Sequence, residues 1–520
     1  MRASPATKRV KRVKLRRRLY LHQLRALAYT TTHRHPALLM RMRLGKTLVA
    51  IRTILRYQPR DPSAGLRVLV VAPGAALGSW ERELRDEGER SITYLDGSRL
   101  ARLARLRESA RWLLLNSDGG WLAVPEVGGV GRCPDCFGRG TRRVVDRRSD
   151  GYERERKVGC STCGRRGWLP LDSPVVSWDA VVLDESTFVK NPKTRVSRFF
   201  LENFRNVPHR WIMTGEPTPE GPLDAWCQIA FLDGTAFGHD SYWGWRQLDF
   251  EPTESGWGWM LDPARQARVD AMLGARAFVL RHEDAGFFVK RVRERRDLRM
   301  PLDIWKAYRT AQREFILEWK GEEKARTMFA CARWHWLRQM CSGFVDGNLV
   351  WDGKVRELVD LLNGELRSES VVVWFAYNQE IAAVSKALRT EKIGYESITG
   401  AVSKAAQRHI IERFNQGWVR VLLVQSAVDK GLRGARLDSA STAIYFSNNP
   451  SQEIRTQSED RLIHMQKTAP ILYVDMAARG TVEEDLADLL VEKERRSDGA
   501  LARAVMERAR QRVAAEGRAR

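Results

Sequence analysis

Cysteine is scarce in this chain, with 7 residues among 520, too few for a disulfide framework at this length. No apolar run approaches the roughly 18 residues that a membrane-spanning helix needs. The basic N-terminus is not followed by an apolar stretch, so we expect no secretory signal. These absences predict a protein of a reducing, cytoplasmic compartment with no place in a membrane.

Acidic residues are also few beside the basic ones: 64 Asp and Glu face 88 Lys and Arg, a net charge of +24. Such an excess favours a polyanionic partner, most simply nucleic acid. Residues 1–19 carry nine of the basic residues and no acid. This segment is either a solvated tail or an arm that lies on phosphates. A membrane surface is the weaker alternative, because no amphipathic anchor accompanies the charge.

Hydrophobic residues make up 43% of the chain, which excludes a disordered protein. Short apolar runs typical of buried parallel strands alternate with amphipathic stretches. The predicted strands are 68–72, 112–115, 180–183, 210–213, 371–375, 420–424, 442–446 and 470–474. We predict two doubly wound α/β domains, 20–298 and 354–490, separated by a helical connector, 299–353. A segment rich in glycine, cysteine and arginine, 128–170, interrupts the first domain, and a charged helix is expected over 491–520.

The sequence Leu-Gly-Lys-Thr at 44–47 lies between a short apolar run and a helical pattern. A phosphate-binding loop needs this order. Gly45 lets the backbone approach the phosphates, Lys46 neutralises their charge, and Thr47 ligates Mg²⁺. The full phosphate-loop pattern is not met, because its first glycine is replaced by Met40. A chance match is therefore the alternative.

Two carboxylates, Asp184 and Glu185, follow the predicted strand 180–183, where an α/β sheet presents catalytic groups. In this position Asp184 would hold Mg²⁺ through water, and Glu185 would polarise the attacking water. The alternative is an acidic junction between a strand and a helix that has no catalytic role. This alternative is less favoured because Lys46 is also present.

Four of the cysteines form two pairs with metal-ligand spacing, Cys133-x-x-Cys136 and Cys160-x-x-Cys163, each followed by glycines. Four thiolates from two tight turns match tetrahedral Zn²⁺, and the glycines permit the turns. Two disulfides or reduced spectator thiols are the alternatives. The surrounding arginines either contact DNA or only keep the insertion hydrated.

Several further stretches carry a family resemblance. They are LYLHQ (19–23), VLVVAPGAALGSWERE (68–83), DESTFVKNPKT (184–194), MTGEPTPEGPLDAWCQIAFLD (213–233), FNQGWVRVLLV (414–424), GARLDSA (434–440) and QSEDRLIHMQK (457–467). With the Gly-Lys-Thr loop, they resemble in type and order the motifs of superfamily 2 helicases and translocases. The resemblance covers about residues 19–490. It is closest to the Swi/Snf-type branch and its phage-encoded DEAD/DEAH-like relatives. The cysteine insertion is similar to the cysteine-rich module of J-domain chaperones.

The resemblance implies two RecA-like domains that bind ATP and Mg²⁺, with a zinc-binding insertion in the first. It implies DNA-dependent ATP hydrolysis coupled to movement on nucleic acid, with duplex DNA as the foremost partner and replication or recombination proteins as further partners. If the protein is phage-encoded, its compartment is the host cytoplasm. The family roles fall on residues that share these motifs: Gln23 for adenine; Gly45, Lys46, Thr47 and Asp184 for ATP and Mg²⁺; Glu185 and Arg461 for catalysis; Thr214, Gly215 and Gly434 for coupling.

The chain departs from the family pattern at several positions, among them Arg43, Glu216, Arg436 and His464. His464 stands where the family has a second arginine, and a neutral imidazole cannot replace a charged bidentate guanidinium. The departure leaves a second function open, a nucleotide-gated nucleic-acid clamp with weak or no hydrolysis. If the segment is helical, Arg461 and His464 share one face, and Arg455 is the alternative second arginine.

A tryptophan-rich segment, 242–259, contains Trp243, Trp245, Trp257 and Trp259. Stacking on nucleic-acid bases is one interpretation, and packing of an irregular lobe is the commoner one.

Overall fold

The computed structural model describes residues 17–491, apart from 64, 109, 148–152, 253–258, 287–288, 320–325, 433–435, 465–466 and 468. The predicted basic arm and the predicted C-terminal helix therefore lie almost entirely outside the described residues. The chain divides into two compact units, the first reaching Leu280 and the second beginning at Arg281. Among the described helices, none has the length and apolar character that crossing a bilayer requires.

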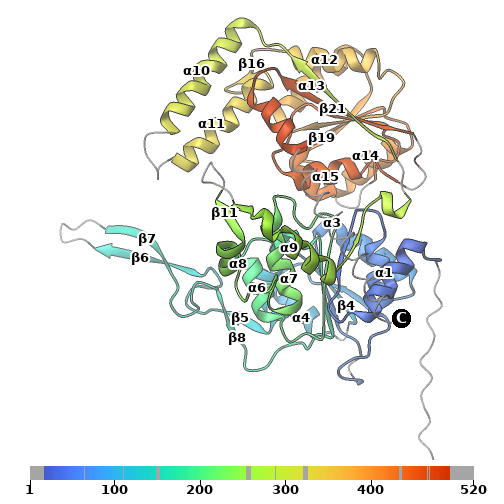
Figure 1. The fold of residues 1–520 in the computed structure, drawn as a ribbon, viewed down its shortest axis with the longest axis vertical. Coiled ribbons are helices and arrows are strands. Elements are labelled where there is room, and N and C mark those ends of the chain that lie inside the picture. Colours follow the sequence, from blue (N-terminus) through green and yellow to red (C-terminus); the bar gives the residue numbers. More distant parts are fainter. Residues whose placement is uncertain are drawn as a thin grey trace, which may run out of the picture. The chain divides into compact units, whose positions relative to one another are not determined.

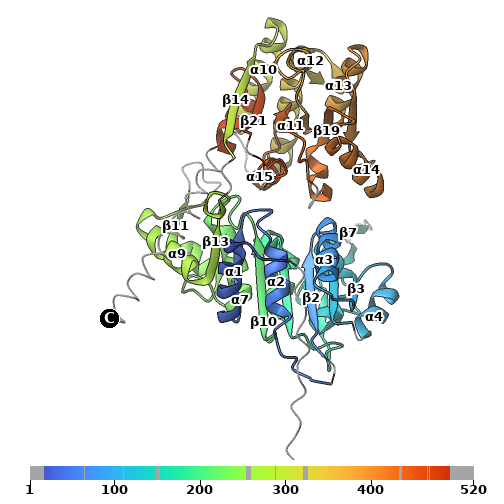
Figure 2. The ribbon, with the colours of Figure 1, turned by 90° about the vertical axis from the view of Figure 1, so that its right-hand side faces the viewer.

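The first unit is built on a parallel sheet of seven strands (Figures 1 and 2). In spatial order they are β13 (Ala277–Leu280), β1 (Ala37–Met40), β10 (His209–Thr214), β9 (Ala180–Asp184), β2 (Val68–Ala72), β4 (Trp112–Asn116) and β3 (Ile92–Tyr94). From β2 the chain passes to β3 at one edge and returns to β4, and it then continues through β9, β10 and β13 on the other side of β2, which is a doubly wound order. The four strands predicted here form because their apolar runs are buried on both faces.

The helices of the first unit connect these strands. They are α1 (Leu21–Thr32), α2 (Lys46–Ile54), α3 (Gly74–Asp86), α4 (Arg99–Arg107), α5 (Gly120–Ala123), α6 (Arg195–Asn203), α7 (Ala225–Asp233), α8 (Tyr242–Asp249) and α9 (Pro263–Arg276). A short hairpin, β11 (Phe250–Pro252) with β12 (Trp259–Leu261), follows α8. The cysteine insertion consists of two antiparallel pairs, β5 (Val130–Arg132) with β8 (Trp168–Pro170) and β6 (Thr141–Arg147) with β7 (Glu153–Gly159). The β6–β7 hairpin projects away from the sheet (Figure 1).

The second unit contains a parallel sheet of six strands. Their order is β14 (Arg291–Leu298), β21 (Ile471–Ala478), β20 (Thr442–Tyr445), β17 (Val371–Phe375), β19 (Val421–Gln425) and β18 (Tyr395–Ile398). Its helices are α10 (Leu302–Trp319), α11 (Arg326–Cys341), α12 (Gly353–Asn363), α13 (Asn378–Thr390), α14 (Lys404–Asn415) and α15 (Gln452–Asp460), and a small hairpin joins β15 (Phe344–Val345) to β16 (Asn348–Leu349). The central strands form one apolar core with α12 and α13.

The strand β14 lies in the second sheet, although the first predicted domain extends to residue 298. Its sequence, RVRERRDL, has no apolar run, and it pairs with β21 along its whole length. A charged strand at the edge of a sheet has no apolar pattern that sequence reasoning would detect.

Candidate nucleotide and metal sites

The loop between β1 and α2 has the geometry of a phosphate-binding loop. Gly45, which caps α2, has a φ of 80°, and Lys46 is the first helical residue. A Cβ atom at Gly45 would lie 2.1 Å from Nε2 of Gln23. A side chain here would be strained by the left-handed backbone and would displace the side chain of Gln23, so glycine suits this position.

Gln23 supports the loop from α1. Its side-chain Nε2 donates to the carbonyl of Leu44 at 3.3 Å, and its Oε1 accepts from the backbone of Tyr20 at 3.1 Å. The residue is 6% exposed. The structure thus places Gln23 against the phosphate loop, and its contact with adenine stays a prediction.

Lys46 and Asp184 lie at the same edge of the sheet, because β1 and β9 are parallel and both end there. Lys46 Nζ donates to the carbonyl of Met40 at 2.7 Å, and Asp184 accepts from the indole nitrogen of Trp80 at 2.8 Å. Burial, reinforced by the charge of Glu185 and opposed by that of Lys46, raises the pKa of Asp184 to about 6. A desolvated carboxylate facing a lysine suits a divalent cation.

The residues after β9 and β10 are joined by hydrogen bonds. Glu185 has a left-handed backbone, with a φ of 50°, and its carboxylate accepts from the hydroxyl of Thr214 at 3.3 Å. The same hydroxyl accepts from the backbone nitrogen of Glu216 at 3.2 Å. A Cβ atom at Gly215 would lie 3.3 Å from the backbone nitrogen of Met42. The Thr-Gly turn therefore touches both the phosphate loop and Glu185.

Glu216, a departure from the family pattern, has a structural partner. Its carboxylate pairs with the guanidinium of Arg41 at 2.6 Å, and the two side chains are 8% and 5% exposed. The pair ties the turn after β10 to the phosphate loop across 175 residues of sequence. Sequence reasoning did not single out Arg41. The sequence did carry a signal, because Arg41 and Glu216 are uncommon residues of opposite charge in two motifs. The fold brings these two motifs into contact.

In the second unit, Arg461 follows the last residue of α15 and is 1% exposed. Its guanidinium donates to the carbonyl of Leu432. The helix ends at Asp460, so the segment from Arg461 to His464 is not helical and the condition for a shared helical face is not met. His464 is half-buried, and its carbonyl accepts from the backbone of Lys467 at 3.0 Å. Gly434 lies outside the described residues.

Arg455 is bound to carboxylates of its own unit. Its guanidinium pairs with Asp475 at 2.5 Å and with Glu459 at 2.6 Å, donates to Asn448 at 2.6 Å, and lies over the ring of Tyr445. These partners hold its pKa well above the usual value despite burial. The arrangement gives Arg455 a structural role and argues against it as the second catalytic arginine.

The structure brings the four cysteines of the insertion together. Their sulfur atoms all lie within 4.8 Å of one another, and each residue is at most 2% exposed. The sulfurs are 3.9 Å apart between Cys133 and Cys160 and 3.7 Å apart between Cys136 and Cys163. Sulfurs at about 2.3 Å around a tetrahedral zinc are separated by about 3.8 Å, so the cluster fits Zn²⁺.

The two cysteine turns are related by an approximate twofold repeat. Gly140 donates to the sulfur of Cys136 and Gly167 to that of Cys163, both at 3.2 Å. Reciprocal bonds, both 3.0 Å long, join the backbone nitrogen of Cys133 to Gly167 and that of Cys160 to Gly140. Backbone donors aimed at the sulfurs stabilise thiolates. Cys227 and Cys341 lie outside the insertion and are buried in the two units.

Arg195, at the start of α6, connects this cluster to the sheet. Its guanidinium donates to the carbonyls of Gly138 at 2.6 Å and Arg166 at 2.9 Å, one from each cysteine turn. It also lies over the rings of Trp121 and Trp168, at 6.0 and 5.6 Å. Sequence reasoning missed this residue, because the contacts span long stretches of chain.

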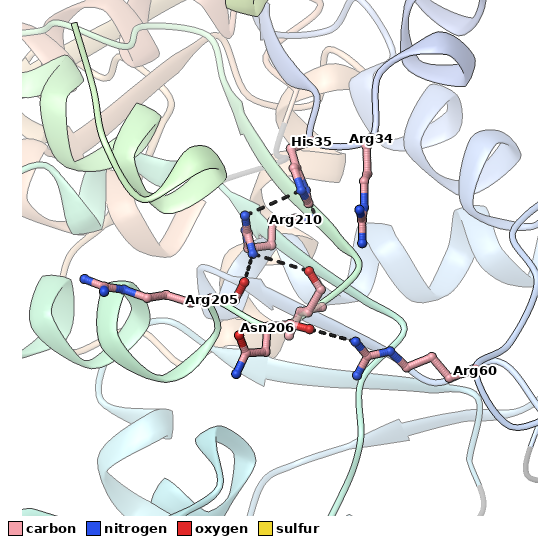
Figure 3. Close-up of a pocket in the computed structure, with 7 residues that line it drawn as sticks. Arg34, His35, Arg60, Arg205, Asn206 and Arg210 are labelled. Carbon is pink, nitrogen blue, oxygen red and sulfur yellow. Dashed lines mark hydrogen bonds between the residues drawn. The ribbon is translucent and has the colours of Figure 1, made fainter. Parts of the chain in front are cut away.

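A basic pocket of about 500 Å³ lies at the amino ends of the strands of the first sheet, near the start of β1 and β10 (Figure 3). Arg34 and Arg60 extend into it, whereas the guanidinium of Arg210 lies 3.5 Å from His35 Nε2 and donates to backbone carbonyls. Burial and the charges of Arg210 and Arg34 lower the pKa of His35 to about 4. This pocket is separate from the edge that holds Lys46 and Asp184.

The protein has an α/β fold, and its candidate nucleotide-binding site lies at the carboxyl ends of β1, β9 and β10. Residues 169–334 match the family model of the SNF2-related domain, and residues 353–466 match that of the helicase conserved C-terminal domain. The first match includes Asp184 and Thr214 but begins after the phosphate loop. The chain therefore contains a region that matches the SNF2-related domain, followed by a region that matches the helicase conserved C-terminal domain.

Among known proteins, the chain is similar to "SWI/SNF-related matrix-associated actin-dependent regulator of chromatin subfamily A-like protein 1" of Xenopus laevis. The two are 20% identical over 330 residues, which are 61% of this chain and 32% of the relative. "Protein CHROMATIN REMODELING 19" of Arabidopsis thaliana is 28% identical over 193 residues, 37% of this chain and 21% of that protein. The chain thus spans about a third or less of these relatives.

Among solved structures, the SWI2/SNF2 ATPase core of Sulfolobus solfataricus in complex with double-stranded DNA aligns with a TM-score of 0.40 and 17% identity. The alignment covers 95% of this chain and 96% of that one.

Proposed function

We propose that this protein is an ATP-dependent DNA translocase or helicase of superfamily 2, and that it tracks along duplex DNA. One observation carries the proposal: the phosphate loop, Asp184, Glu185 and Thr214 meet at one edge of a parallel sheet. The net charge of +24 supports a polyanionic partner. A phage or prophage origin, suggested by the sequence resemblance, belongs to this proposal.

The residues of the first unit have distinct roles in this proposal. Lys46 would exchange its bond to Met40 for the β- and γ-phosphates, Thr47 would ligate Mg²⁺, and Asp184 would hold the ion through water. When bound, Mg²⁺ would supply neutralisation of phosphate charge. Glu185 orients the attacking water. Gln23 positions adenine beside the loop.

Coupling depends on the hydroxyl of Thr214. It bonds to Glu185 on one side and to the backbone of Glu216 on the other. A change of charge or position at Glu185 therefore alters the turn that contains Gly215. In the second unit, Gly434 is proposed to take part in coupling and Arg461 to stabilise charge on the γ-phosphate.

We also propose that Cys133, Cys136, Cys160 and Cys163 bind a structural Zn²⁺. Four thiolates close the coordination shell, so the ion would stabilise the insertion without entering the reaction.

A nucleotide-gated clamp with weak hydrolysis is the second candidate. It is favoured by His464, which lacks the charge and the bidentate geometry of the family arginine. According to this hypothesis, ATP binding changes the affinity of the protein for DNA, and ATP hydrolysis is slow.

One assay separates the two functions. ATP turnover is measured without polymer and with duplex DNA, single-stranded DNA or RNA, for the wild type and for Lys46→Ala. A translocase is expected to be stimulated by duplex DNA, and the variant to be inactive but folded. Nucleotide-dependent DNA binding without stimulated turnover supports the clamp, and turnover retained by Lys46→Ala contradicts the assigned loop.

A further inference from the structure

Four side chains of the first unit form an exposed stack that the ATP site does not use. The guanidinium carbon of Arg246 lies 4.8 Å from the ring centre of Trp243 and 4.3 Å from that of Trp259. Lys193 Nζ lies 5.3 Å from the ring centre of Trp243. We call these four residues the tryptophan–arginine stack.

The stack is not a continuation of the hydrophobic core. On α8, Trp243 and Arg246 are three residues apart and share a helical face. Trp245 lies on the other face, is fully buried, and stacks on Phe237 at 4.6 Å. Packing of this lobe is therefore served by Trp245, whereas Trp243 remains 44% exposed.

The second tryptophan of the stack is presented by the β11–β12 hairpin. Trp259 is 36% exposed, and Met260, its neighbour on β12, is 54% exposed. Leu248, on α8, is 66% exposed. Large aromatic and aliphatic groups that stay in water cost free energy unless a ligand covers them.

The positive charges of the stack are not neutralised within the part of the chain that the structure describes. No carboxylate there lies within salt-bridge distance of Lys193 or Arg246, and Nε of Arg246 is buried without a hydrogen-bond partner. The nearby Asp249 is paired with Arg268 at 2.8 Å instead. Cations that lie between aromatic rings and lack acidic partners fit an anionic ligand with flat apolar parts.

We propose that the tryptophan–arginine stack binds a strand of duplex DNA, and this inference rests on the proposed function. Arg246 and Lys193 contact phosphates, which they match in charge. Trp243 and Trp259 pack on deoxyribose rings of the backbone, and such contacts carry no sequence information. A translocase needs such sequence-independent contacts.

The stack is linked to the ATP site through one short segment. Lys193 lies in the turn that begins after Asp184 and Glu185 and ends at α6. In this turn Lys190 pairs with Asp224 at 3.3 Å, at the start of α7. A DNA strand bound to Lys193 would therefore transmit force to the segment that carries Asp184 and Glu185.

The test measures the binding of a labelled blunt duplex, and of one of its strands alone, by fluorescence anisotropy at several salt concentrations. Trp243→Ala and Trp259→Ala are each expected to weaken binding by about tenfold, because each variant loses the apolar area that the ring buries against the DNA backbone. Trp243→Phe is expected to recover part of that loss. Lys193→Ala is expected to reduce the slope of log affinity against log salt by about 0.9, which corresponds to one phosphate.

Leu100→Ala is the control, because Leu100 is 79% exposed on α4 and lies outside the stack and outside the stretches that carry the family resemblance. The control, the melting temperature and the binding of ATP should not change. Wild-type duplex affinity in both tryptophan variants overturns the inference and leaves the proposed function standing. A wild type that neither binds duplex DNA nor responds to it refutes the proposed function itself. A loss confined to single-stranded DNA overturns the assignment to a duplex.

Discussion

Replacing Asp184 by asparagine is expected to stabilise the nucleotide-free protein while abolishing turnover. Folding raises the pKa of this carboxyl group from 3.8 to about 6, chiefly through burial. The increase corresponds to about 3 kcal/mol by which the folded state disfavours the charged form. Asparagine keeps an oxygen for Trp80 but loses one hydrogen bond, worth about 1 kcal/mol. The net gain in the free energy of unfolding is about 2 kcal/mol.

This gain in the free energy of unfolding must increase as the pH rises. An acid whose pKa rises on folding destabilises the folded state only where the unfolded chain is ionised. Below about pH 4, charge removal therefore adds nothing to the free energy of unfolding of the variant. The stabilisation grows between about pH 4 and pH 6 and is constant above about pH 6. For a unit of this size, about 2 kcal/mol raises the melting temperature by about 4–8 °C.

Calorimetric melting of the wild type and the variant across this pH range tests the argument. Asp118→Asn, a change at an exposed position, provides the control and should show no such dependence. Adding Mg²⁺ and ATP should stabilise the wild type and not Asp184→Asn. If the variant melts below the wild type at neutral pH, or if the difference does not vary with pH, Asp184 is not a buried charge in the folded protein.

Four further predictions test other parts of the protein. Arg41→Ala or Glu216→Ala alone should cost about 3–5 kcal/mol, and the double variant less than the sum, in a double-mutant cycle of unfolding free energies. Cys133→Ser should reduce zinc, measured by elemental analysis, from near one ion per chain to near none; retained zinc would contradict the ligand set. Arg461→Ala should lower turnover by about 10³ or more with ATP still bound. His464→Arg should raise DNA-stimulated turnover, and a slower variant at every pH would contradict the assigned role of His464.

The sequence was most informative where local pattern and tertiary environment agree. The run at 68–72 is apolar throughout because a central parallel strand is buried on both faces, and the structure forms β2 over those residues. The cysteine pairs were recognisable because two ligands from one tight turn need a fixed spacing. Asp184 and Glu185 were recognisable because parallel strands present their functional residues at one edge.

Contacts between distant segments could not be read from any local pattern. The pairing of Arg41 with Glu216 and the clamp of Arg195 on both cysteine turns depend on which loops the folded chain brings together. The same holds for the tryptophans: residues two apart on α8 point to opposite sides, so that Trp245 is core and Trp243 is surface. By itself the sequence determined the apolar parallel strands, the two cysteine pairs and the order of the motifs, because these follow from periodicity and spacing. Only the tertiary structure decided which charges are paired, which carboxylate is desolvated and which aromatic rings stay exposed, because burial is set by neighbours that are distant in sequence.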